Sequence, residues 1–314
     1  MIAPWRINRR AALTRSAQAA TRGQDPAPRP RDSGSTANGG PAVDARLQRR
    51  VQRYGWDRAA QDYEGLWQGQ LAVAQRALLQ AVALAPGEEV LDVACGTGLV
   101  TLAAAAAVGP GGRVLGTDIS AQMVEAAARR ARERALAHAQ FARMEAEALA
   151  LPPAGFDAAL CALGLMYLPD PLRALGELRR VLRAGGRLGL AVWGERERCG
   201  WAAVFPVVAA EVASEICPLF FRLGQTGVLA QLCSEAGFGA VVERRIGSVL
   251  AYESAEQACA AAFVGGPVAL AWSRFSEQAR ARARARYLAA IEPWRQGPRY
   301  ELPGEFVVVS ARAP

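Results

Sequence analysis

The sequence predicts a doubly wound α/β fold: a mostly parallel, seven-stranded sheet with helices on both faces and a helical cap. Between residues 89 and 193, short apolar segments alternate with helical segments of about ten residues or more. Strands separated by helices of this length form βαβ units, and both faces of the resulting sheet are covered. A turn with two glycines follows the first apolar segment directly, as it does in nucleotide-binding sheets of this class.

The segment 1–43 is expected to form a disordered tail outside this fold. It is rich in Arg, Ala, Ser, Pro and Gly, and residues 23–41 offer almost nothing to bury. Arg9 and Arg10 resemble a twin-arginine export signal, but residues 14–16 interrupt the apolar segment that such a signal needs. Disorder, or a start codon assigned too far upstream, explains the composition better than targeting does.

The segment 44–88 is expected to be helical. Apolar residues recur at near-helical spacing from Val51 to Trp67, and a second helix is expected over about 70–84. The sequence Ala85-Pro86-Gly87 ends that second helix. Large aromatic side chains are concentrated in this short stretch: Tyr54, Trp56, Tyr63 and Trp67.

The segment 89–314 is expected to form one domain. Its expected strands are 89–94, 113–117, 140–144, 156–160 and 187–193, with helices over 99–108, 121–137 and 171–182. Further along, the expected elements are a helix over 228–236, a strand over 240–245, a helical stretch from 254 to about 291 and a strand over 305–311. Two insertions, at about 199–224 and 254–300, interrupt the alternation and are expected to form the helical cap.

Composition excludes several classes of catalytic site. All 37 residues of the Lys+Arg count are arginines, so neither a P-loop lysine nor a Schiff-base lysine exists. The single histidine, His138, is expected to be an exposed turn residue without a catalytic role. The six cysteines contain no C-x-x-C pair, and we expect no metal site.

The formal charge of +8 does not by itself predict a nucleic-acid or membrane partner. The richness in Ala, Arg and Gly is typical of a GC-rich genome, and arginines of that origin mostly lie on solvated surface. No apolar run reaches the ~18 residues of a membrane helix. We therefore expect a cytoplasmic protein, monomeric or homodimeric, that binds neither nucleic acid nor membrane.

The segment 90–98 (VLDVACGTG) is the most informative part of the chain. Gly96 and Gly98 leave the turn after the strand free of side chains, and the start of the next helix offers N–H groups to an anionic ligand. Asp118 ends the next strand, where a carboxylate is placed to accept hydrogen bonds from ribose hydroxyls. The third glycine of G-x-G-x-x-G is missing, so the pattern fits a dinucleotide poorly.

Five motifs in order resemble those of the class I S-adenosylmethionine-dependent methyltransferases, a family with a Rossmann-like fold. They are VLDVACGTG (90–98), LGTDIS (115–120), EAEAL (145–149), FDAAL (156–160) and RVLRAGG (180–186). The likeness covers roughly residues 50–245 and the last strand. It is closest to the small-molecule branch, methyltransferase type 11, which includes quinone-biosynthesis enzymes. Two departures are Glu145, where Asp is usual, and Ala184, which replaces a proline.

The resemblance implies a site for S-adenosylmethionine. The residues that it assigns to this cofactor are Tyr63, Asp92, Ala94, Cys95, Gly96, Gly98, Asp118, Ile119, Met123, Glu145, Ala146 and Cys161. Asp92 would orient the ammonium group, Asp118 would hold the ribose hydroxyls, and Cys161 would lie beside the sulfonium. The family often uses an N-terminal helical lid with an aromatic residue such as Tyr63, although ordinary core packing of Tyr63 stays an open alternative.

The predicted activity is methyl transfer to a small, largely apolar acceptor of the phenol, quinol or amine type. In-line displacement depends mainly on alignment and exclusion of water. The sequence shows no convincing general base, and only Tyr167 and Glu195 are candidates. Aromatic residues in 199–224 and 254–300 would line an apolar acceptor pocket or fill the core of the cap, and both interpretations stay open.

Other classes of function remain possible at this stage. The chain could be a non-catalytic module that binds S-adenosylmethionine, or a nicotinamide-dependent oxidoreductase, which the missing third glycine disfavours. A thiol-dependent enzyme of the arsenite methyltransferase type would need Cys161, Cys199 and Cys217 to converge. The clamp [DN]-P-P-[YF] of enzymes that methylate base amines is absent after residue 160, which disfavours a nucleic-acid substrate.

Overall fold

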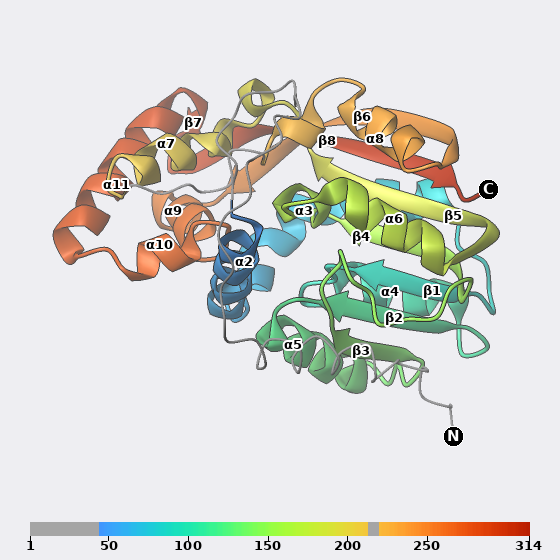
Figure 1. Cartoon of the computed structure of the whole chain (residues 1–314). Helices are drawn as coiled ribbons and strands as arrows, with labels where there is room; N and C mark the ends of the chain where they lie inside the picture. Colours follow the sequence, from blue (N-terminus) through green and yellow to red (C-terminus); the bar gives the residue numbers. More distant parts are fainter. Residues whose placement is uncertain (1–43, 213–219) are drawn as a thin grey trace, which may run out of the picture.

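The computed structural model describes residues 44–212 and 220–314, and these build one twisted sheet with helices on both faces (Figure 1). The five parallel strands are β1 (Glu89–Val93), β2 (Arg113–Asp118), β3 (Ala139–Arg143), β4 (Phe156–Ala162) and β5 (Leu182–Trp193). Two long strands, β6 (Gly239–Tyr252) and β8 (Arg299–Arg312), continue the sheet in antiparallel pairing. The strand order is β3-β2-β1-β4-β5-β8-β6, so the predicted doubly wound fold is confirmed.

The sheet has one strand more than the seven that the sequence predicts. The additional strand, β7 (Arg295–Gln296), pairs with the beginning of β8. It has two exposed residues and no apolar pattern, so sequence periodicity gives no signal for it. β8 also begins at Arg299 rather than at residue 305, because its first residues pair with the far end of β6.

Helices cover the two faces of the sheet separately. One face packs on α3 (Tyr63–Val82) and α4 (Leu99–Val108), and the other packs on α6 (Pro171–Val181) and α8 (Val228–Glu235). The helix α5 (Ala121–Glu133) follows β2 and is capped by the Ser120 side chain. It ends four residues before the predicted position 137, and Ala135 takes a left-handed conformation with φ of 54°.

The N-terminal helical segment divides at a different place from the predicted one. The helix α2 (Ala45–Ala59) ends before a short turn at residues 60–62, and α3 then continues to Val82. The predicted break near residue 68 is wrong because buried positions continue at helical spacing through it: Trp67, Leu71, Ala74, Leu78 and Val82.

The cap lies beyond one end of the sheet, and α2 lies between the cap and the sheet (Figure 1). The cap helices are α7 (Val204–Ala209), α9 (Ala255–Phe263), α10 (Ala269–Ser273) and α11 (Glu277–Ile291). Short 3₁₀ turns are η1 (Leu165–Tyr167), η2 (Arg196–Arg198), η3 (Gly200–Ala203), η4 (Arg222–Gly224) and η5 (Glu292–Trp294). The helical stretch predicted over 254–291 is thus three helices, interrupted first where Gly265-Gly266-Pro267 cannot continue a helix.

His138 is buried, not exposed as the sequence predicts. It is 7% exposed, and its Nε2 lies 2.8 Å from the Ala105 carbonyl oxygen at the end of α4. The histidine therefore joins a helix terminus to the turn before β3. Within 44–212 and 220–314, no helix is long and apolar enough to cross a membrane.

Candidate functional site

The turn after β1 is held in shape by Asp118 at the end of β2. The Gly96 N–H donates to Asp118 Oδ2 at 2.9 Å, and the Ser120 N–H donates to Asp118 Oδ1 at 2.9 Å. Ala94 and Gly96 have positive φ values of 55° and 54°, so the turn folds back over the carboxyl ends of both strands. Asp118 is 7% exposed, and burial raises its pKa to about 6 despite the two N–H donors.

Asp92, on β1, is a buried carboxylate with one uncommitted oxygen. Its Oδ2 accepts a hydrogen bond from the Thr101 hydroxyl at 2.5 Å, whereas Oδ1 has no partner among the described residues. Burial raises the pKa of Asp92 to about 7, and the nearby Asp118 adds to that shift, against the lowering effect of the Thr101 hydrogen bond. In its ionised form, a buried carboxylate with an unpartnered oxygen attracts a cationic ligand.

A cavity lies at the carboxyl ends of β1, β2 and β3, and it is here called the polar cavity because charged side chains, among them Asp118, Glu145 and Glu147, stand in its otherwise mostly apolar lining. The predicted residues that line it are Tyr63, Ala94, Gly96, Asp118, Ile119, Met123, Glu145 and Ala146. Asp92 and Cys95 line a smaller hollow that shares Tyr63, Ala94 and Gly96 with the polar cavity. The structure therefore brings most of the predicted site residues together at the switch point of the doubly wound sheet, where ligands of such sheets bind.

Two predicted residues, Gly98 and Cys161, do not line these cavities. Gly98 has a φ of 85°, and a Cβ there would come within 3.0 Å of the Ala127 Cβ on α5. Its absence of a side chain thus serves the packing of α4 on α5. Cys161 is 1% exposed and packs in the core, because side chains alternate along β4 and Ala162 is the residue that reaches the cavity.

An adjoining cavity, here called the aromatic cavity, extends from the polar cavity towards the cap. Its aromatic lining consists of Trp56, Tyr63, Trp67, Tyr167, Trp193 and Trp201. Tyr63 and Tyr167 also line the polar cavity, so they stand at the junction of the two. Burial, and secondarily the charge of Asp118, raises the pKa of Tyr63, which keeps its hydroxyl protonated at neutral pH.

The Trp201 indole has an unusual hydrogen-bonding state. Its ring packs against Trp67, Trp193 and other aromatic neighbours at centroid distances of 5.6 Å and 4.9 Å for these two. The side chain is 1% exposed, yet its Nε1–H has no partner among the described residues. Buried indole N–H groups normally find a partner, so Trp201, which lines the aromatic cavity, carries an unused donor.

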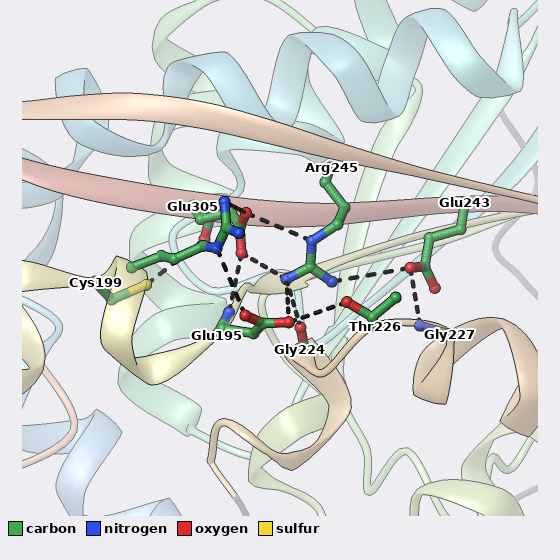
Figure 2. A network of polar contacts seen from close by, with 9 residues as sticks. Glu195, Cys199, Gly224, Thr226, Gly227, Glu243, Arg245 and Glu305 are labelled. Carbon is green, nitrogen blue, oxygen red and sulfur yellow. Dashed lines mark hydrogen bonds and ion pairs between the residues drawn. The ribbon is translucent and has the colours of Figure 1, made fainter.

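Glu195 lies outside both cavities, just after β5, in a network with charged side chains on β6 and β8 (Figure 2). Its Oε1 accepts from the Thr226 hydroxyl at 3.0 Å and lies 3.4 Å from the Arg245 Nη2. Arg245 also pairs with the buried Glu305 at 2.5 Å. The structure therefore does not bring Glu195 to the site as a general base. Trp193, the last residue of β5, lines the aromatic cavity, and Glu195 follows it outside that cavity.

Sequence reasoning missed the inward face of α2. Arg49, Gln52 and Trp56 line the polar cavity from this helix. Arg49 donates to the buried Glu147 at 2.6 Å, and the Ser120 hydroxyl donates to Asp57 at 2.6 Å. The spacing of 49, 52 and 56 is that of one helical face, and it is the signal that could have identified these residues.

The described residues contain no group of three or more His, Cys, Asp or Glu side chains placed to hold a metal ion. Cys161 and Cys199 are buried free thiols on different elements. Burial raises the pKa of both to about 12. Cys217 lies outside the described residues.

Comparison with known proteins identifies the region that carries the polar cavity. Residues 90–186 match the family model described as a methyltransferase domain. The matched part of the chain runs from β1 into β5 and leaves out α2, α3 and the cap.

Curated relatives match part of the chain. It is 36% identical over 135 residues to nocamycin O-methyltransferase of Saccharothrix syringae, which covers 43% of this chain and 48% of that protein. It is 39% identical over 102 residues to demethylmenaquinone methyltransferase of Lactococcus lactis subsp. lactis, which covers 32% of this chain and 40% of that protein. The chain thus spans less than half the length of these relatives.

Solved structures share the fold of this chain over most of its length. A structure of Haemonchus contortus phosphoethanolamine N-methyltransferase 2 with S-adenosyl-L-methionine gives a TM-score of 0.53 at 15% identity, covering 82% of this chain and 57% of that one. The [4+2]-cyclase SpnF gives 0.51 at 24% identity, covering 77% and 81%. At these identities the likeness shows the fold alone.

Proposed function

We propose that this protein transfers the methyl group of S-adenosylmethionine to a small, largely apolar acceptor. The observation that carries the proposal is the junction of two unlike cavities. The polar cavity contains carboxylates and a glycine turn, and the aromatic cavity opens from it between Tyr63 and Tyr167. A charged cofactor and an apolar acceptor would therefore meet at that junction.

The residues of the polar cavity fit S-adenosylmethionine. The uncommitted Oδ1 of Asp92 suits an ammonium group, and the bare Gly96 backbone leaves room beside it. Asp118 suits ribose hydroxyls, while Ile119 and Met123 offer apolar surface to an adenine. When bound, S-adenosylmethionine supplies an electrophilic methyl group next to a positively charged sulfur.

Asp92 and Asp118 would orient the cofactor through charge-assisted hydrogen bonds. Asp118 would share its oxygens between the ribose and the Gly96 and Ser120 N–H groups that it already accepts. Glu145 is exposed, and its Oε2 lies 3.8 Å from the Arg49 Nε. Its carboxylate would bind the adenine edge from this position beside the arginine. Because α2 covers the polar cavity, it would exclude water from the junction of the two cavities.

The lining of the aromatic cavity favours a phenol or quinol over an amine. Among the described residues that line it, none is Asp, Glu, His or Arg. An ammonium group would lose its hydration there without gaining a counter-charge. The free Nε1–H of Trp201 would instead donate to an oxygen of the acceptor. The names of the two curated relatives, an O-methyltransferase and a quinone methyltransferase, are compatible with such an acceptor.

Catalysis would then rest on alignment. Tyr63 keeps its proton at neutral pH and so acts as a hydrogen-bond donor, while Tyr167 stands on the other side of the junction. Holding two reactants in line contributes an effective molarity of about 10⁵ M or more, and no base is required if the acceptor is already ionised.

The proposal is tested by incubating the protein with methyl-labelled S-adenosylmethionine and a panel of phenols, quinols and amines, followed by mass spectrometry. We expect labelled O-methyl or C-methyl products from aromatic oxygen-bearing acceptors and none from alkyl amines. Asp118→Ala, which removes the ribose ligand, is the negative control. Cofactor binding without any labelled product would instead support a non-catalytic binding module.

A further inference from the structure

The helix α2 has two unlike faces. Its inward face carries Arg49, Gln52 and Trp56, which line the polar cavity. Its outward face carries three large apolar side chains that are 48%, 39% and 48% exposed: Leu47, Val51 and Tyr54. These positions are four and three residues apart, so they form one apolar stripe along the helix surface.

Within Ala45–Ala59, the exposed charges beside this stripe are all positive, and the exposed Asp44 caps the start of the helix. The exposed positions of α2 are Arg46, Leu47, Arg50, Val51, Tyr54 and Arg58, so every one is an arginine or a large apolar residue. The Arg53 guanidinium lies 4.6 Å from the centre of the Tyr54 ring. The acidic residue of the helix, Asp57, accepts from the Ser120 hydroxyl and faces the body of the protein.

We propose that the outward face of α2 docks on an anionic phospholipid surface. Helices that lie in the membrane interface combine an apolar stripe with flanking arginines, and their affinity is the sum of apolar burial and attraction to anionic headgroups. The sequence analysis expects no membrane partner, since no apolar run is long enough to span a bilayer. A helix that lies on the surface needs no such segment.

Docking does not require α2 to leave the body of the protein. Gln48 donates to the Tyr167 carbonyl oxygen at 3.1 Å, and Arg49 and Asp57 keep their bonds to Glu147 and Ser120. The membrane would therefore lie against the outward face of the helix that covers the polar cavity. This inference does not rest on the proposed methyl transfer, because lipid binding is measured without any turnover.

The experiment is flotation of the full chain with vesicles of phosphatidylcholine alone and with vesicles containing one third phosphatidylglycerol. We expect binding to the anionic vesicles only. The triple variant Leu47→Gln/Val51→Gln/Tyr54→Gln is expected to lower the partition coefficient by about tenfold or more. Arg46→Gln/Arg50→Gln is expected to lower it by about tenfold and to reduce its salt dependence.

A matched control removes the same residue types elsewhere. Arg244→Gln/Val249→Gln changes an exposed arginine and a valine that is 60% exposed, both on β6, and is expected to bind like the parent. Folding of every variant is checked by binding of S-adenosylhomocysteine and by near-ultraviolet circular dichroism.

Three results would overturn the proposal. The parent could fail to bind anionic vesicles, or the α2 variants could bind as well as the parent, which would assign binding to another basic segment such as residues 1–43. Sedimentation could also show a parent dimer and a monomeric triple variant. The stripe would then belong to an interface between two copies of the chain.

Discussion

The two cavities of this protein are built on different physical principles. The polar cavity and the smaller hollow beside it depend on backbone N–H groups, positive φ values and two buried carboxylates, Asp118 and Asp92. The aromatic cavity depends on the packing of large rings such as Trp193 and Trp201. Few side chains can replace a buried carboxylate that holds a turn, whereas many apolar side chains fill similar volumes.

This difference agrees with the extent of the family match. The family model ends at residue 186, so it contains the β1 and β2 turns but not the cap. The comparison teaches that the cofactor side of the site is constrained by hydrogen-bonding geometry, and the acceptor side by shape. The acceptor must therefore be found by measuring what the aromatic cavity binds.

The largest effect is expected from Asp118→Ala. It removes the proposed ribose ligand and leaves the Gly96 and Ser120 N–H groups without their acceptor. We expect the affinity for S-adenosylhomocysteine to fall by about 100-fold, in keeping with the loss of charge-assisted hydrogen bonds. Calorimetric titration measures it. The control Asp62→Ala removes an aspartate whose side chain makes no capping bond on α3 and should bind normally; equal loss in both variants would contradict the assignment.

Asp92→Asn should separate binding from stability. Folding raises the pKa of Asp92 from 3.8 to about 7, so ionised Asp92 lowers the free energy of unfolding as pH rises through that interval. Asparagine removes this cost. We expect a higher Tm of the ligand-free variant at about pH 8, no gain at about pH 4, and a loss of about 30-fold in affinity for S-adenosylhomocysteine.

The same carboxylate predicts a pH dependence of binding in the parent. The affinity for S-adenosylhomocysteine should rise as pH rises through about 7, because a ligand ammonium group binds only the ionised form of Asp92. Asp92→Asn should flatten this profile. A parent profile that is flat between about pH 6 and about pH 8 would show that Asp92 does not face the ligand charge.

Trp201→Phe tests the acceptor side by removing the free indole N–H while keeping an aromatic ring. Once an acceptor is known, we expect its KM to rise by about tenfold, the value of one hydrogen bond to a buried donor. The affinity for S-adenosylhomocysteine should stay within about twofold, because Trp201 does not line the polar cavity. Trp193→Phe, in the same cavity, is the matched control; an equal rise in KM for both variants would mean that ring volume matters and the N–H does not.

The smallest effect is expected on α2, the helix that covers the polar cavity. Arg49→Met breaks the ion pair with Glu147, which is 2% exposed and keeps the Asp170 N–H as a donor. We expect S-adenosylhomocysteine to dissociate about threefold to tenfold faster in stopped-flow displacement, because α2 loses one of its bonds to the body. Arg50→Met, on the outward face of the same helix, should leave the dissociation rate unchanged.

Sequence analysis predicted the sheet and the polar cavity closely because both leave local patterns. Apolar runs bounded by glycine placed β1 and α4 within one residue, and the spacing from Gly98 to Asp118 brought both strand ends to one site. The errors lie where tertiary contact decides. His138 is buried by a bond to Ala105, and Glu195 is drawn into a charge network by Arg245. Neither partner is near in sequence, so no local pattern could reveal it.

The central claim is that the polar cavity binds an adenosyl sulfonium cofactor. The most direct measurement is calorimetric titration of the full chain with S-adenosylmethionine, S-adenosylhomocysteine and NADH in parallel. The account predicts micromolar binding of both adenosyl ligands and no binding of NADH. Binding of NADH, or the absence of binding by both adenosyl ligands, would contradict it.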